Sequence, residues 1–108
     1  MDEAVYRLIG LAFRAGKLLT GHDEILRALK EGKGNLLILT EDISDRTGKE
    51  YISAAEKSDV EIRRFGTKEA LGHAVGKTAR PAVLVTEAGF GKTISKKIEN
   101  DGYRGTGG

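Results

Sequence analysis

Two short apolar runs constrain the fold of this chain more than any other feature of its sequence. Residues 36–39 read Leu-Leu-Ile-Leu and residues 82–85 read Ala-Val-Leu-Val, with no polar residue in either run. Such runs are typical of strands covered on both faces, because a strand with one exposed face alternates apolar and polar residues. At four residues each, they are also far too short to cross a membrane. These runs predict buried strands inside a layered fold.

The segments around these runs alternate between helical and strand patterns. Apolar residues at helical spacing or helix-capping residues predict helices over residues 3–15, 22–31, 44–57, 68–75 and 88–100. Strands are expected over residues 17–20, 35–40, 60–65 and 82–86. Alternation of this kind predicts an α/β sandwich with helices on both faces of a small sheet. Gly10 lies inside the first helix, where it suggests a close packing contact.

Length and composition favour one small domain that is not stabilised by disulfide bonds or a metal ion. The chain has 108 residues and no cysteine, which excludes a disulfide scaffold, a thiolate nucleophile and a cysteine-ligated zinc ion. Its two histidines have no metal-ligand spacing, so we expect no metal or other cofactor. Residues 1–100 are predicted to form the domain, and residues 101–108, with four glycines, a flexible tail. A net charge of +2 does not by itself indicate a nucleic-acid partner. The absence of a signal-peptide pattern predicts a cytoplasmic protein.

In α/β folds, ligands usually lie at loops that join strand ends to helix starts. Four turns of this kind are expected, at Thr20–Asp23, Thr40–Ser44, Phe65–Thr67 and Thr86–Gly89. The last one leads into Gly91-Lys92-Thr93, which resembles the end of a phosphate-binding P-loop, as does Gly76-Lys77-Thr78. Both lack the upstream glycine that the motif requires, and Glu87 puts a carboxylate where a triphosphate would lie. A glycine-rich helix start with a solvated lysine is therefore the simpler interpretation, with nucleotide binding as an alternative.

No catalytic constellation is evident. Glu41 and Asp42 are adjacent, and neighbouring residues on an extended chain point to opposite sides, so they do not form an acid–base pair. Ser44 and Ser53 have no histidine at a spacing that suggests a nucleophile. The sequence therefore predicts a protein that is not an enzyme.

Four segments in a fixed order carry a resemblance to a known family. They read Leu-Ile-Gly-Leu-Ala-Phe-Arg-Ala-Gly-Lys at 8–17, Gly-His-Asp-Glu-Ile-Leu-Arg-Ala-Leu-Lys-Glu-Gly at 21–32, Leu-Leu-Ile-Leu-Thr-Glu-Asp at 36–42, and Leu-Gly-His-Ala-Val-Gly at 71–76 followed by Arg80-Pro81. Together they resemble the superfamily of ribosomal kink-turn RNA-binding proteins, and the first segment resembles its bacterial YlxQ-type branch. The resemblance extends over about residues 5–92.

The resemblance implies both a fold and a ligand. The fold is a three-layer α/β/α sandwich around a four-stranded mixed sheet. The ligand is a sharply bent RNA, in which tandem sheared G·A pairs follow a short bulge. The implied partners are structured RNA, either ribosomal or containing a kink-turn, and the ribosome. Apart from the resemblance, we expect no membrane partner and take the monomer as the default state. The implied RNA-binding residues are Lys17, Gly21, His22, Asp23, Glu24, Arg27, Lys77, Arg80 and Val83. Among them, Arg80 would contact phosphate and Val83 a base.

The chemistry of the second helix fits this ligand. Its first turn offers free backbone N–H groups and a positive dipole end to phosphate, and Gly21 allows close backbone approach. Arg27 is able to donate two hydrogen bonds to guanine O6 and N7, while Glu24 and Asp23 are able to accept from base amino and imino groups. The ring of His22 is able to stack or to hydrogen-bond. Asp23 stands where the family usually has Asn, so this position accepts but does not donate.

Three simpler interpretations stand beside this one. The two acids of the second helix are ordinary first-turn residues, and Asp23 with Arg27 is a common i, i+4 pair. Lys77 and Arg80 are common as solvated loop charges. A protein-interaction module on the same fold, associated with the ribosome or with transcription, is the main alternative to RNA recognition.

Overall fold

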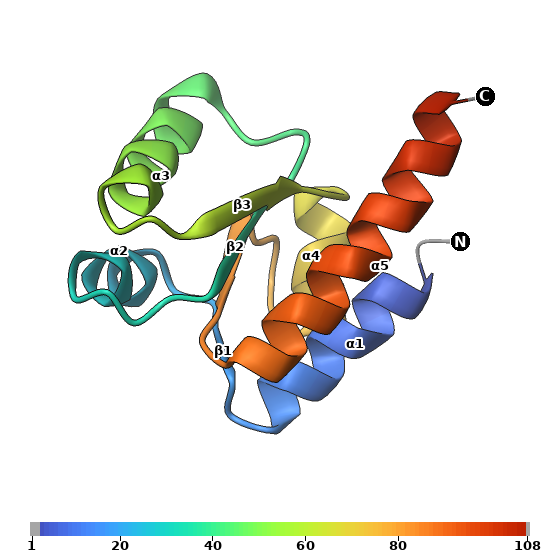
Figure 1. Cartoon of the computed structure of the whole chain (residues 1–108), viewed down its shortest axis with the longest axis horizontal. Coiled ribbons are helices and arrows are strands. Elements are labelled where there is room, and N and C mark those ends of the chain that lie inside the picture. Colours follow the sequence, from blue (N-terminus) through green and yellow to red (C-terminus); the bar gives the residue numbers. More distant parts are fainter. Residues whose placement is uncertain (1–2, 108) are drawn as a thin grey trace.

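The computed structural model describes the backbone of residues 3–107 and the side chains of residues 3–100 (Figure 1). Within that range the chain forms five helices and four strands. In chain order they are α1 (Glu3–Arg14), β1 (Leu18–Leu19), α2 (His22–Lys30), β2 (Leu36–Leu39), α3 (Asp45–Lys57), β3 (Glu61–Arg64), α4 (Lys68–Ala74), β4 (Ala82–Val85) and α5 (Ala88–Gly107). Each helix and strand predicted from the sequence is present at nearly the predicted bounds, except for the end of α5. No helix in the described part of the chain has the length and apolarity needed to cross a bilayer.

The four strands form one mixed sheet in the order β1-β4-β2-β3. Strands β2 and β3 run parallel, with Leu36 opposite Glu61. Strand β4 runs antiparallel to both of its neighbours, with Ala82 opposite Leu39 of β2 and Val85 opposite Leu18 of β1. Three strands therefore point the same way and β4 points against them. This arrangement confirms the predicted α/β class with a four-stranded mixed sheet.

The two apolar runs are the two central strands, and helices cover both of their faces. Successive residues of a strand point to opposite faces. Accordingly, Leu36 and Ile38 pack with α1, α4 and α5, while Leu37 and Leu39 pack with α2 and α3. Figure 1 shows the two groups of helices on opposite sides of the sheet. This is the predicted three-layer α/β/α sandwich, and it explains why neither run contains a polar residue.

Helix α1 packs closely against α4, as Gly10 indicates. A Cβ atom at this buried position would lie 3.0 Å from the carbonyl oxygen of Ala74 at the end of α4. At its end α1 turns at Gly16, which has a φ of +75°. The N–H groups of Gly16 and Lys17 donate to the carbonyls of Phe13 and Ala12, the pattern of a Schellman cap. The cap directs the chain into the short edge strand β1.

Helix α5 is longer than the sequence predicts. Its start at Ala88 agrees with the prediction, but the helix continues to Gly107 rather than ending near residue 100. Glycine-rich sequence has low helix propensity, which is why the prediction ended earlier. Residue 108 and the side chains after Asn100 lie outside the described residues. The flexibility of residues 101–108 stays a prediction.

Three of the four predicted ligand turns meet at one end of the sheet. Because β1, β2 and β3 point the same way, the turns that follow them, at residues 20–23, 40–44 and 65–67, lie at the same edge. Residues 80–81 also reach this edge, because they precede the antiparallel strand β4. We call these four segments the loop end. The fourth predicted turn, Thr86–Gly89, follows β4 and therefore lies at the opposite edge.

Backbone hydrogen bonds join the segments of the loop end. The N–H of Thr40 donates to the carbonyl of Pro81 at 2.9 Å, and that of Glu41 donates to the carbonyl of Gly66 at 2.8 Å. The N–H of Lys68 donates to the Asp42 carboxylate at 3.0 Å. The loop that follows β2 is thereby fixed to the starts of α4 and β4. Side chains on these segments project from a supported surface.

Candidate functional site

The first turn of α2 is closed by its own glutamate. Oε1 of Glu24 accepts hydrogen bonds from the backbone N–H groups of Gly21 at 3.1 Å and Thr20 at 3.3 Å. Gly21, at the N-cap, has no side chain to cap the turn, so Glu24 satisfies these donors from within the helix. A Cβ atom at Gly21 would lie 3.1 Å from the Glu24 Cγ, which shows that the glycine leaves room for this carboxylate. Glu24 thus keeps one oxygen, Oε2, for an external partner.

The side chain of His22 contacts α3, the other helix of the layer that α2 and α3 form on one face of the sheet. Its Nδ1 lies 2.8 Å from the Tyr51 hydroxyl, and its Nε2 lies 3.6 Å from Oε1 of Glu50. The His22 and Tyr51 rings meet edge to face, with centroids 5.2 Å apart and planes at 73°. Burial raises the pKa of the Tyr51 phenol to about 12, and the negative charges of Glu50 and Asp23 act in the same direction. The hydroxyl therefore remains a donor at neutral pH.

Sequence reasoning missed Tyr51 and Glu50. Tyr51 is 1% exposed and is the only aromatic residue of α3. A single large aromatic residue in a helix with few apolar residues was a usable signal that this position is buried. Nothing in the sequence connects it to His22, because the two residues are 29 positions apart.

Asp23 and Arg27 lie exposed on α2, and their side chains have no hydrogen-bond or ion-pair partner in the described part of the chain. Among the described residues, no hydrogen bond or ion pair involves either side chain, so the i, i+4 pair considered from the sequence is not formed. The backbone N–H groups of His22, Asp23 and Glu24 likewise have no acceptor within the described part of the chain. The start of α2 therefore presents three backbone donors, a carboxylate and a guanidinium to solvent.

The loop between α4 and β4 folds back along α4. A Cβ atom at Gly72 would lie 2.1 Å from the carbonyl oxygen of Thr78, so only glycine permits this approach. The N–H of Arg80 donates to the carbonyl of Lys68 at 2.9 Å, near the start of the same helix. Nη1 of Arg80 donates to the hydroxyl and carbonyl oxygens of Thr78 and to the carbonyl of Ala79. The Arg80 guanidinium braces the loop through one of its nitrogens.

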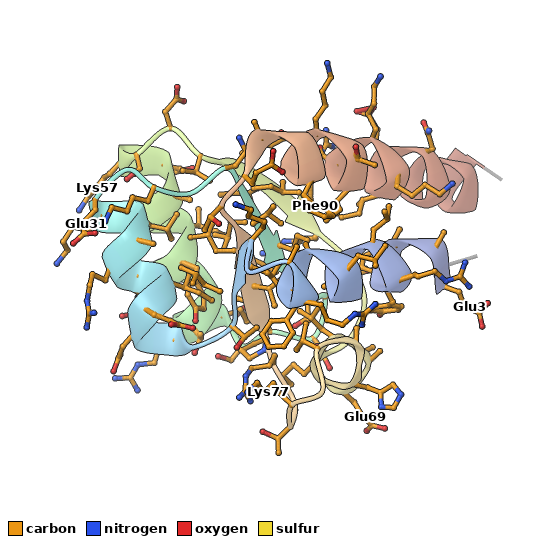
Figure 2. All side chains as sticks on the ribbon, turned by 90° about the horizontal axis from the view of Figure 1, so that it is seen from below. Glu3, Glu31, Lys57, Glu69, Lys77 and Phe90 are labelled. Atoms are coloured by element: carbon orange, nitrogen blue, oxygen red, sulfur yellow. The ribbon has the colours of Figure 1, made fainter. Side chains whose placement is uncertain are left out.

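Lys77 lies on this loop and contacts α1. Its Nζ is 5.7 Å from the centroid of the Phe13 ring, within the range of a cation–π contact. Figure 2 shows Lys77 at the loop beside α4, on the side of the molecule where α4 lies next to α1. Its charge remains exposed, as the sequence predicted for a loop lysine.

Two residues predicted for the site do not belong with the others. Val83 is fully buried in the central strand β4, and the loop before it ends at Pro81. The expected contact of Val83 with a base is therefore wrong, because a side chain with no exposed surface cannot touch a ligand.

Lys17 precedes β1, whereas Gly21 follows it, so Lys17 lies at the opposite edge of the sheet. There its carbonyl accepts from the N–H of Thr86, and its charge helps to lower the pKa of Glu87.

The start of α5 is not a phosphate site. The Glu87 carboxylate accepts from the N–H groups of Gly89 at 2.9 Å and Phe90 at 2.8 Å, and these hydrogen bonds hold its pKa below the usual range. It occupies the helix start as the sequence analysis expected. Gly91 is explained by packing, because a Cβ atom there would lie 1.7 Å from Oδ1 of Asn35. Within the described residues, no group of three His, Asp or Glu side chains is placed to hold a metal ion.

A groove lies between α1 and α4. It is open and has a volume of about 1020 Å³. Small residues of both helices line it together with charged residues of both signs, among them Arg7, Arg14, Asp42 and Glu69. It contains none of the site residues predicted from the sequence.

Fold and site together define a small α/β/α binding domain with a charged loop end. The family of the Ribosomal protein L7Ae/L30e/S12e/Gadd45 type matches this chain over residues 3–95, and the chain belongs to that family. The resemblance to its YlxQ-type branch, expected from the sequence, is confirmed by the relatives that follow.

Two curated relatives cover most of the chain. The RNA-binding protein YlxQ of Bacillus subtilis is 33% identical over 94 residues, which are 87% of this chain and 94% of that protein. The large ribosomal subunit protein eL30 of Saccharomyces cerevisiae is 30% identical over 91 residues, which are 82% of this chain and 86% of that protein. These relatives are RNA-binding and ribosomal proteins rather than enzymes, in agreement with the sequence analysis.

Two solved structures share the fold. A protein of unknown function from Bacillus halodurans C superposes with a TM-score of 0.83 and 32% identity, covering 88% of this chain and 96% of that one. The 15.5kD RNA binding protein of Giardia lamblia gives a TM-score of 0.71 at 22% identity, covering 88% of this chain and 84% of that one. The second similarity concerns the fold alone.

Proposed function

We propose that this chain is a non-enzymatic RNA-binding protein that recognises bent, structured RNA, kink-turn-like or ribosomal, at its loop end. Its family and the names of its relatives support the RNA-binding part of the proposal. Because RNA is read where its helix is distorted, a bent site suits a small protein with one exposed helix start. The cytoplasm, where ribosomal RNA resides, is the proposed location, and the monomer is the proposed state.

The observation that carries this proposal is the uncommitted chemistry at the start of α2. Three backbone N–H groups and the side chains of Asp23 and Arg27 have no partners among the described residues. Backbone donors at a helix start bind phosphate, and the Arg27 fork is matched to guanine O6 and N7. Asp23 accepts from the imino and amino groups of guanine, and Oε2 of Glu24 accepts from a base amino group. Each of these roles needs an exposed base edge.

The loop before β4 offers positive charge to the RNA phosphates, whereas the two acids at the start of α2 are negative. Lys77 is exposed, and Arg80 has guanidinium nitrogens beyond the one that braces the loop. Arg80 precedes Pro81, whose carbonyl accepts from the N–H of Thr40 within the loop end. We assign phosphate contacts to both residues. Such contacts position the RNA, and Arg27 specifies the base.

Fluorescence anisotropy with a labelled kink-turn RNA tests this function. The control RNA has its tandem G·A pairs replaced by Watson–Crick pairs, and both are titrated at about 50 and 200 mM salt. We expect tight binding that is lost with the control RNA. Equal binding to both that falls steeply with salt would indicate a general phosphate binder and would contradict recognition of bent RNA.

The α1–α4 groove supports one alternative, a protein-interaction module. It has a volume of about 1020 Å³, and none of the residues assigned to RNA lines it. Arg14→Glu changes the charge of this groove without touching the loop end. If a ribosomal or transcription partner loses affinity for this variant while RNA affinity is negligible throughout, the interaction module replaces the RNA-binding proposal.

A further inference from the structure

We infer that His22 is a stacking platform for one unpaired, unstacked nucleobase, and that Tyr51 and Glu50 hold its ring in position. The inference rests on the proposed RNA-binding function and adds to it the kind of contact that His22 makes. It also assigns a positioning role to two residues of α3. The sequence left two possibilities for the His22 ring, stacking or hydrogen bonding, and the geometry favours the first.

The hydrogen bond of the Tyr51 hydroxyl indicates which nitrogen of a neutral His22 ring carries the proton. Tyr51 is 1% exposed, and His22 Nδ1 is the hydrogen-bond partner given for its hydroxyl. A buried hydroxyl proton needs an acceptor, so the Tyr51 O–H donates to Nδ1 at 2.8 Å. A neutral imidazole that accepts at Nδ1 carries its proton on Nε2. That nitrogen faces Oε1 of Glu50 at 3.6 Å.

Both nitrogens of His22 are thus directed toward α3. Nδ1 is already hydrogen-bonded, and a base edge that binds Nε2 would have to compete with the nearby Glu50 carboxylate. The ring nevertheless remains accessible, because the His22 side chain keeps 47% of its surface exposed. A hydrogen bond to a ring nitrogen lies in the plane of the ring, so the contact that we infer for a ligand is with a ring face. Nucleobases stack on such faces whatever their sequence.

The orientation of the ring is fixed before any ligand binds. The T-shaped contact with Tyr51, at 73° between planes, and the hydrogen bond at Nδ1 together restrict rotation about the side-chain bonds. A platform that is already oriented loses less conformational entropy on binding. It also stands at the first residue of α2, beside the free backbone donors, so a base on His22 places its own phosphate near those N–H groups.

The test uses a kink-turn RNA with 2-aminopurine at one unpaired nucleotide at a time, because this fluorescent base is quenched by stacking. Binding is followed by anisotropy in the same samples. His22→Phe keeps a flat ring without nitrogens, and His22→Gln keeps hydrogen-bonding groups without a ring. Tyr51→Phe removes the hydroxyl that holds the ring. Lys96→Ala, on α5 in the opposite layer, is the control for loss of a surface residue.

We expect one labelled position to be quenched fully by the wild-type protein and by Lys96→Ala. His22→Phe should quench it only in part, because its ring stacks but has no nitrogen to accept from the Tyr51 hydroxyl. His22→Gln abolishes the quench and weakens binding by about tenfold, and Tyr51→Phe reduces the quench while the circular dichroism spectrum stays unchanged. If His22→Gln quenches as well as the wild type, the stacking role is wrong, although RNA binding itself stands. If His22→Gln keeps both affinity and quench while His22→Phe loses them, the ring acts through hydrogen bonds. Failure of the wild-type protein to bind would overturn the proposed function and the stacking role together.

Discussion

Oε1 of Glu24 lies 3.1 Å from the backbone nitrogen of Gly21, so the helix that is proposed to read RNA is capped by one of its own candidate reading residues. The same oxygen also accepts from the N–H of Thr20, at the start of the turn after β1. One acid therefore supports the turn, and its neighbour Asp23 is left free for the ligand. Two acids that are adjacent in sequence have different tasks because the cap needs only one of them.

This division predicts different effects for two Glu24 variants. Glu24→Ala leaves both backbone donors without an acceptor, and we expect a loss of about 0.5–2 kcal/mol in the free energy of unfolding. Glu24→Gln retains an acceptor oxygen and is expected to lose less. Urea unfolding measures both. Equal stability of Glu24→Ala and the wild type would show that the cap does not contribute.

Arg27 is predicted to affect binding without affecting stability. Its guanidinium has no partner among the described residues, so Arg27→Ala should leave the unfolding midpoint unchanged. If it reads a guanine edge, the loss of affinity is about 1–3 kcal/mol, with relaxed preference at one base. Arg27→Lys keeps the positive charge but loses the planar set of guanidinium donors, so it should recover little of the lost affinity. Titration of RNAs with each base at the contacted position measures both effects, and uniform weakening across all four would assign Arg27 to phosphate instead.

Lys77 and Arg80 are predicted to act through charge. Replacing either by Ala should weaken binding to all RNAs alike and reduce the slope of log K against log salt by about one. The Arg80 variant should also loosen its loop, because Nη1 of this residue bonds Thr78 and Ala79. Lys96→Ala is the matched control for a surface charge remote from the loop end. An unchanged salt slope in the Arg80 variant would show that Arg80 makes no phosphate contact.

Two glycines give a matched test of packing. A Cβ atom at Gly72 would meet the Thr78 carbonyl oxygen at 2.1 Å, whereas at Gly48 in α3 it would meet Ile43 at an ordinary 3.6 Å. We expect Gly72→Ala to destabilise the protein by about 1–3 kcal/mol, because the backbone must shift. Gly48→Ala should be neutral or stabilising by up to about 1 kcal/mol. Thermal unfolding separates the two, and equal stability of both variants would contradict the close approach of the loop to α4.

The Tyr51 phenol predicts a pH dependence in alkali. Its pKa in the folded protein is about 12, above the ordinary value of 10.0. The folded state therefore holds this proton more tightly than the unfolded state, and the resulting stability is fully present below pH 10 and is lost as pH rises toward about 12. Ultraviolet titration should show one late tyrosinate that is absent from Tyr51→Phe. An ordinary titration of all tyrosines would contradict the burial of this hydroxyl beside His22.

The layers of the fold were predictable because local sequence determines them. The apolar run at 36–39 already required cover on both faces, and Thr67 and Ser44 cap α4 and α3 as expected. The same reasoning predicts a buried Val83 within 82–85, whereas the resemblance to the family implies a base contact for this side chain. Val83 is fully buried, in agreement with the apolar pattern of its own strand.

The direction of β4 and the contacts of His22 were beyond sequence reasoning. Whether β4 runs parallel or antiparallel decides which edge receives Thr86–Gly89, and a four-residue apolar strand has no local signal for its direction. The contact between His22 and Tyr51 joins two helices that are adjacent only after α2 and α3 pack on the sheet. Both features depend on tertiary packing. Local patterns predict elements, and the packing of those elements decides which side chains meet.

The central claim is the location of the RNA interface, and backbone amide chemical shifts of the isotope-labelled protein test it most directly. Kink-turn RNA is added to the protein, and each amide is followed. If RNA binds at the loop end, the largest shifts fall on residues 21–27 and 76–81, and Lys17 and the start of α5 are unaffected. Shifts concentrated along the α1–α4 groove, with residues 21–27 unchanged, would contradict it.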